Sequence, residues 1–166
     1  DVHVTGTIRG LERAASNYGP GDFGGIVGYS TAYPDDGVTW TQIKNCSFDG
    51  TITTTVSVST RWQKAIGGIV GLGGDYDLME DCYTSGNIKC LGVGETYQVG
   101  GIKAFGGSVP EYGGGTKHCY SSMDISVSGR TAHTIGGFAG GLEGYNERCY
   151  STGDVTVDVT DKVFDI

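Results

Sequence analysis

The stretch Phe23-Gly24-Gly25-Ile26-Val27-Gly28 recurs in a chain of 166 residues, with later copies at 66–71, 99–104 and 135–140. The second glycines of successive copies lie 43, 33 and 36 residues apart (25 to 68, 68 to 101 and 101 to 137). Such recurrence is typical of a repeat protein, whose repeats stack to bury a continuous core. Paired glycines indicate a corner or bulge that a Cβ atom would strain. The predicted structural glycines are Gly24, Gly25, Gly67, Gly68, Gly100, Gly101, Gly136 and Gly137.

Each glycine motif is followed by a short strand around one cysteine, and an alternating strand comes a few residues later. We expect the cysteines to hold equivalent structural positions: Cys46, Cys82, Cys119 and Cys149. Because side chains alternate between the two faces of a strand, apolar residues two positions apart should point inward together. The predicted inward columns are Val2, Ile52, Ile88, Ile125 and Val155, and then Val4, Thr54, Cys90, Val127 and Val157.

Three short strands per repeat predict an all-β fold, a parallel β-helix of about four to five three-sided coils. The segment Asp1-Val2-His3-Val4 resembles 154–157, so we expect the chain to start and stop at the same station of the repeat. The prediction is a single domain over 1–166, with a half repeat at 1–10 and repeats at about 11–58, 59–92, 93–128 and 129–166. Matching open ends suggest either a slice of a longer array or copies that stack end to end.

The third glycine motif departs from the others, because Lys103 stands where Val27, Val70 and Ala139 stand in the other copies. Lysine is rarely accepted in a dry column. We therefore expect this column to face outward or to lie at a corner.

The composition excludes several classes of function. A net charge of −8, with 11 scattered Lys and Arg residues, does not provide the basic stripe that a nucleic-acid-binding protein needs. The same charge disfavours anionic membranes, and no apolar run approaches the length of a transmembrane helix. We expect neither nucleic acid nor a membrane as a partner.

The whole pattern resembles the bacterial GLUG-motif repeats. The resemblance rests on Gly-Gly-[Ile/Phe]-[Val/Ala]-Gly, then Asn/Asp-Cys-Tyr, then Gly-x-[Ile/Val]-x-[Val/Cys], and it covers nearly the whole chain in four copies. Lys103 and Met123 are departures in the third copy. The resemblance implies a secreted or surface-anchored bacterial protein, such as an adhesin or the non-catalytic part of an IgA-specific metallopeptidase. It implies no agreed activity.

The cysteine column has two interpretations. Adjacent Cα atoms at about the strand spacing lie within the range of a disulfide. Parallel stacking does not usually give the disulfide dihedral, so a ladder of small buried thiols is the alternative. Paired Cys-x2-Cys or clustered histidines are missing from the sequence, so we expect no metal site.

Aromatic residues give the candidate ligand contacts. The column next to the cysteines contains Tyr83, Tyr120 and Tyr150, and polar residues flank it. Exposed rings beside hydrogen-bonding groups suit a sugar, whereas stacked tyrosines also stabilise neighbouring strands. Trp40 and Trp62 lie in the predicted loops of the longest repeat and are further candidates, because binding residues collect on loops.

The sequence predicts no catalytic residue and no cofactor. The acidic pairs Asp35-Asp36, Asp75 with Asp77, and Glu80-Asp81 lie in separate segments, without a strand that projects two carboxylates and a base together. A structural Ca²⁺ ion at 73–77 is an alternative, although this run is shorter than a known calcium loop. Neither a serine-nucleophile elbow nor a phosphate-binding loop is present.

We expect a non-catalytic structural or adhesive module of an extracellular bacterial surface protein. Its partners would be copies of itself or flanking domains of a longer surface protein. The alternative is a module that binds a carbohydrate or a host protein through the outward tyrosines and the loop tryptophans.

Overall fold

The computed structural model describes residues 1–11, 21–30, 41–57, 62–74, 77–106, 115–141 and 145–166. These residues form strands and turns without a helix, and the strands among them pair in parallel. In this part of the chain no helix is long and apolar enough to cross a membrane. The chain is therefore all-β, as predicted.

The strands follow the repeat. The first strand, β1, covers Val2–Leu11. The first repeat contributes β2 (Phe23–Gly24), β3 (Val27–Tyr29), β4 (Gln42–Lys44) and β5 (Cys46–Val56). The second contributes β6 (Trp62–Gly67), β7 (Val70–Leu72), β8 (Leu78–Glu80) and β9 (Tyr83–Gly92). The third contributes β10 (Glu95–Gly100), β11 (Lys103–Phe105), β12 (Gly115–Lys117) and β13 (Tyr120–Gly136). The last strands are β14 (Asn146–Glu147), β15 (Tyr150–Ser151) and β16 (Val155–Asp165).

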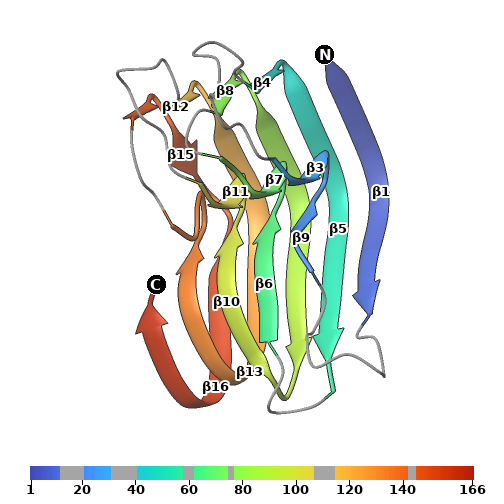
Figure 1. Cartoon of the computed structure of the whole chain (residues 1–166), viewed down its shortest axis with the longest axis vertical. Helices are drawn as coiled ribbons and strands as arrows, with labels where there is room; N and C mark the ends of the chain where they lie inside the picture. Colours follow the sequence, from blue (N-terminus) through green and yellow to red (C-terminus); the bar gives the residue numbers. More distant parts are fainter. Residues whose placement is uncertain (12–20, 31–40, 58–61, 75–76, 107–114, 142–144) are drawn as a thin grey trace.

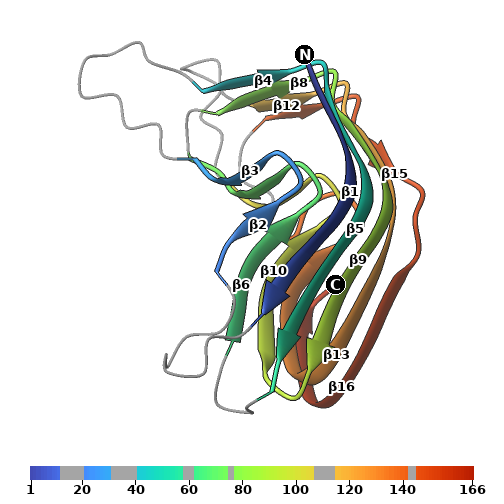
Figure 2. The ribbon, with the colours of Figure 1, turned by 90° about the vertical axis from the view of Figure 1, so that its right-hand side faces the viewer.

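Equivalent strands of successive repeats pair side by side in three sheets. The large sheet contains two series, β1-β5-β9-β13 and β2-β6-β10-β13, which meet on β13. The small sheets are β11-β7-β3 and β14-β12-β8-β4. Figure 1 shows the long strands β1, β5, β9 and β13 lying in sequence across the molecule. From the side they form one curved wall, with β6 and β10 facing them across the interior (Figure 2). This arrangement is consistent with a β-helix.

The register confirms the inward columns of the alternating strands. Ile52 pairs with Ile88, and Ile88 with Ile125. All three are at most 1% exposed. Thr54, Cys90 and Val127 form the next column and are also buried. β-Branched residues supply most of these strands, which suits a packed, pleated surface.

The predicted alignment of the first residues is wrong. Val2 pairs with Cys46 and Ile8 with Ile52, so the chain enters the repeat at the cysteine strand, six residues earlier than expected. The sequence misled because Val-x-Val occurs both at 2–4 and at 155–157. The register instead follows Ile8, the apolar residue that continues the isoleucine column.

Lys103 is also placed differently from the prediction. Its side chain is only 5% exposed, and its column partners Val70 and Ala139 are buried as well. The column therefore faces inward. The lysine is accepted because its long stem packs within the column while its amine reaches a corner lined by glycines, where it donates to the carbonyl of Gly106.

The paired glycines lie where two backbones approach closely. A Cβ on Gly67 would lie 1.9 Å from the carbonyl oxygen of Val70, and one on Gly68 would lie 2.0 Å from that of Gly101. The first contact recurs in every other copy within 2.1 Å, and the second recurs at Gly25 and Gly101 within 2.3 Å. At Gly137, in the last copy, the nearest atom is Oγ of Ser151 at 2.8 Å. Contacts this short leave no room for a side chain. The glycines therefore let the chain turn between two sheets while it lies directly on the next repeat.

Candidate functional site

A second corner lies just before each cysteine and has a left-handed backbone without glycine. Its residues have φ angles of 51–53° and are Asn45, Asp81, His118 and Arg148. Three of their backbone N–H groups donate to the next repeat, as from Asn45 to the carbonyl of Glu80 at 3.0 Å. The left-handed turn sends the following cysteine inward and leaves these four side chains exposed.

The cysteine thiols close this corner from the inside. All five cysteines are free thiols, and Cys149 alone among them is not fully buried. Each thiol of the column donates to the carbonyl two residues before it, as in Cys119 to Lys117 at 3.1 Å. These contacts agree with the buried-thiol interpretation rather than the disulfide one.

Neighbouring thiols influence one another. A hydrogen bond between the Cys82 and Cys119 side chains lowers the pKa of Cys82 to about 7. The same bond and burial raise the pKa of Cys119. Burial raises the pKa of Cys90, in the adjacent inward column, to about 12. These three thiols are buried in the core, so we attribute their shifted pKa values to core packing.

The residues after the cysteines form an aromatic ladder on the outer surface. Tyr83 stacks on Tyr120, and Tyr120 on Tyr150, each with ring centroids 5.4 Å apart and an interplanar angle of 8°. Strand register holds the rings in line, because Tyr120 pairs with both other tyrosines. Ser47 and His3 continue the column, with 2.6 Å between His3 Nδ1 and Ser47 Oγ. The rings are 36–57% exposed, so one edge of the stack faces solvent.

Charged residues border one side of this tyrosine ladder. Lys44, Glu80, Lys117 and Glu147 form one column of alternating charge along β4, β8, β12 and β14. Lys44 Nζ lies 2.9 Å from Glu80 Oε2, and this contact lowers the pKa of Glu80. In the next column His118 Nδ1 lies 3.4 Å from Asp81 Oδ1.

Glu80, Asp81 and His118 bring three potential metal-ligand atoms within 4.8 Å of one another. Lys44 already pairs with Glu80, so a cation would compete with an ammonium group. The absence of a metal or other cofactor stays a prediction.

Polar side chains border the other side of the ladder. Ser85 Oγ donates to Asp49 Oδ1 at 2.8 Å, and the Asp154 N–H donates to Asp124 Oδ1 at 3.0 Å. Hydroxyl, carboxylate and amide groups therefore lie on the same face as the aromatic rings. An aromatic strip beside hydrogen-bonding groups can stack on the apolar face of a sugar and contact its hydroxyls.

The two candidate tryptophans add no described contact to this ladder. Trp40 lies outside the described residues. Trp62 begins β6, in the other series of the large sheet, and its side chain is not among those described. Of the acidic pairs, Asp35-Asp36 and Asp75 also lie outside the described residues, whereas Asp77 accepts a hydrogen bond from the Gly74 N–H at 2.8 Å.

A second aromatic ladder was not predicted. His133 stacks between Tyr97, at 4.2 Å, and Phe164, at 4.5 Å. Glu95 contacts Arg130 and lies 3.9 Å from His133 Nε2, while burial lowers the pKa of His133. Tyr97 and His133 both lie two residues before the apolar residue that opens a glycine motif, so aligning those positions would have found the pair. Phe164 follows the last motif and gives no such signal.

Comparison with known families agrees with the repeat pattern. Residues 19–53 match the family model described as the GLUG motif. This segment is a GLUG motif. It contains the first glycine pair, strands β2–β4 and most of β5. No curated protein and no solved structure matches the chain. The GLUG resemblance is thus confirmed for residues 19–53, whereas the link to adhesins or IgA-specific peptidases stays a prediction.

Proposed function

We propose that this chain is a non-catalytic structural and adhesive β-solenoid module, of about four to five three-sided coils, in an extracellular bacterial surface protein. The observation that supports this role is the continuity of the strand register. One apolar column runs without interruption across five long strands and consists of Ile8, Ile52, Ile88, Ile125 and Val155. The repeats therefore stack as a single rod. Such a rod holds a surface at a fixed distance and direction.

The proposal extends to end-to-end stacking. At β16 the inward residues Val155, Val157 and Val159 are only half-buried, and at β1 so are Val4 and Ile8. Both edges thus offer apolar rows and backbone groups that a parallel strand would cover. The partner that fits is another unit of the same repeat, in a second copy or in a flanking domain.

Electron microscopy and sedimentation of the purified chain test this stacking. Filaments, or particles that lengthen with concentration, are expected. Val157→Lys places a charge on the inner row of β16 and should abolish growth, whereas Lys89→Ala, on the outer face, should not. Circular dichroism must show that both variants fold. The stacking part of the proposal would be contradicted by discrete particles at every concentration that also bind no other repeat unit.

The second candidate function is carbohydrate or host-protein binding at the tyrosine ladder. It is favoured by three stacked, exposed rings beside polar side chains. The double variant Tyr83→Ala/Tyr120→Ala should lose retention on a glycan array or on immobilised host glycoprotein. Tyr97→Ala, which changes the other ladder, is the matched control. Retention that depends instead on Trp40 or Trp62 would move the binding surface to their segments, and no retention at all would leave the structural role alone.

A further inference from the structure

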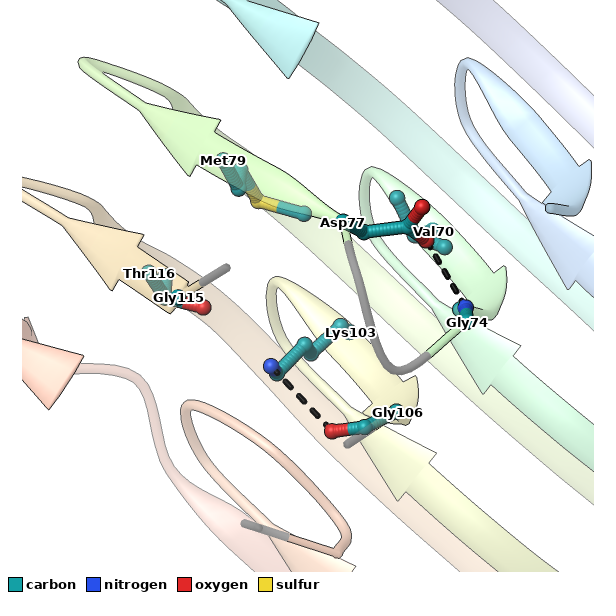
Figure 3. A pocket seen from close by; sticks show the side chains of 9 residues that line it. Val70, Gly74, Asp77, Met79, Lys103, Gly106, Gly115 and Thr116 are labelled. Atoms are coloured by element: carbon teal, nitrogen blue, oxygen red, sulfur yellow. Dashed lines mark hydrogen bonds between the residues drawn. The ribbon is translucent and has the colours of Figure 1, made fainter. Parts of the chain in front are cut away.

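A polar cavity between the described strands does not belong to the repeating columns. It lies between the second and third repeats and has room for the centre of about one water-sized sphere, 10 Å³. Its lining includes Asp77, Lys103, Gly106 and Thr116, from segments around β8, β11 and β12 (Figure 3). Apart from these polar groups its walls are Val70, Met79 and glycine backbone. The cavity is therefore small and locally polar.

Two of the side chains at this cavity have unused hydrogen-bonding capacity. The Thr116 hydroxyl is completely buried, and it has no hydrogen-bond partner among the described residues. Among the described residues, the Lys103 amine donates one long hydrogen bond of 3.4 Å to the Gly106 carbonyl, and its side chain is 5% exposed. An ammonium group carries three donors, and a buried polar group without a partner is unfavourable. Both groups line the same cavity, so a further partner there would stabilise them.

We propose that this cavity is a binding site for one water molecule, which links the Lys103 amine and the Thr116 hydroxyl to the Asp77 carboxylate. A buried water needs a volume of about 10–15 Å³ and two to four polar partners, and the cavity supplies both. The water accepts a hydrogen bond from Lys103 Nζ and donates one to the carboxylate. A small anion fits less well, because Asp77 would repel it.

The water completes a polar connection across three repeats. Ser30, in the first repeat, donates to Asp77 Oδ1 at 3.1 Å, and Ser30 Oγ also lies 3.1 Å from Thr41 Oγ1. Asp77 belongs to the second repeat, and Lys103 and Thr116 to the third. The apolar columns are nearly alike in every repeat and would tolerate a slip by one repeat. A buried polar network between Asp77, Lys103 and Thr116, joined to Ser30, favours the correct order of these three repeats.

A crystal structure of the wild-type chain at about 1.5 Å resolution is the direct test. Density for a water within about 2.7–3.2 Å of both Lys103 Nζ and Thr116 Oγ1 is expected. The proposal is overturned by a cavity without density, by a Lys103 amine that reaches bulk solvent, or by an anion in the site, which bromide soaking would reveal.

A solution measurement gives an independent answer. The ¹⁵N signal of the Lys103 amine should titrate below those of the exposed lysines, because burial lowers its pKa against the opposing attraction of Asp77 and any thiolate at Cys119 or Cys149. Thr116→Val removes one partner of the water and should lower this midpoint further, by about half to one pH unit. Thr131→Val, at a buried threonine that does not line the cavity, should leave it unchanged. An identical midpoint in all three proteins would overturn the proposal.

Stability against pH supplies the last check. In the unfolded chain Lys103 has its ordinary pKa, so the unfolded state holds this proton more tightly than the folded state. Stability should therefore rise with pH between the lowered folded pKa and about 10.4, relative to Lys103→Val. Valine is the residue of the same column in the first two repeats, so this variant should fold. A stability difference that does not change with pH would show that Lys103 is not held as a buried ammonium.

Discussion

Each repeat turns two tight corners, and the two are built in opposite ways. At the glycine corner, Gly67 and Gly68 have no side chain. A backbone oxygen lies about 2 Å from the place where the Cβ atom of each would be. At the cysteine corner, Asp81 keeps its side chain but takes a left-handed backbone, and Cys82 fills the inside with a thiol. The first corner is limited by space and the second by backbone conformation. Substitutions should therefore be far more costly at the first corner.

Gly67→Ala should have the largest effect. Its Cβ would lie 1.9 Å from the Val70 oxygen and 2.8 Å from the Ala104 nitrogen, both backbone atoms that cannot move aside. We expect a loss of about 3 kcal/mol or more in the free energy of unfolding, or failure to fold.

Gly28→Ala is the matched control for this change. The nearest atom to its Cβ is the Asp22 oxygen at 3.0 Å, and the third repeat already has Ala104 at the equivalent position. The loss should stay below about 1 kcal/mol. Urea denaturation compares the two, and equal losses would show that close approach is not what selects glycine.

Cys82→Ala should have the next largest effect. The thiol is completely buried and donates to the carbonyls of Ile43 and Glu80, so its removal leaves a small cavity and loses those contacts. A loss of about 1–2 kcal/mol is expected. Cys149→Ala removes the same two kinds of contact at a half-buried position and should cost less. If the two losses were equal in thermal and urea unfolding, burial would not explain the role of the thiol.

The tyrosine ladder adjoins the cysteine corner and should contribute a smaller amount. Tyr120 stacks on two rings and Tyr150 on one. Because an aromatic pair contributes about 0.5–1.5 kcal/mol, Tyr120→Ala should destabilise by about 1–2 kcal/mol and Tyr150→Ala by about half as much. Urea unfolding of the two single variants measures this ratio. A ladder that serves only to bind a ligand would give no such ratio.

The glycine corner could be predicted from the sequence and the cysteine corner only in part. Paired glycines are visible because no other residue fits at 67 and 68. The cysteine and tyrosine columns could also be predicted, because the same residue type recurs at equivalent positions of the repeats. The left-handed residues were not, because Asn45, His118 and Arg148 share a backbone conformation and no side-chain chemistry.

Lys103 and Val2 show a second limit of the sequence pattern. The polarity of Lys103 predicted a column that faces outward or lies at a corner. The side chain is instead buried in an inward column, and its length lets the amine reach the carbonyl of Gly106. Val2 was aligned by a local Val-x-Val pattern, whereas the register is set by pairing along all of β1. In both cases the deciding contact is with a neighbouring repeat, which a pattern within one repeat does not contain.

Arg148→Gly should give a small change, in the stabilising direction. A left-handed backbone costs an ordinary residue about 1–2 kcal/mol, whereas glycine loses about 0.5–1 kcal/mol of chain entropy on folding. The φ angle of Arg148 is 52°, and its side chain is exposed, so little else is lost. A gain of about 0.5 kcal/mol in the free energy of unfolding is expected. Asn45→Gly, at φ 51°, should change almost nothing, because asparagine adopts this conformation readily. Thermal unfolding of both variants decides the point: a loss at Arg148 would mean that its guanidinium, and not its backbone, stabilises the cysteine corner.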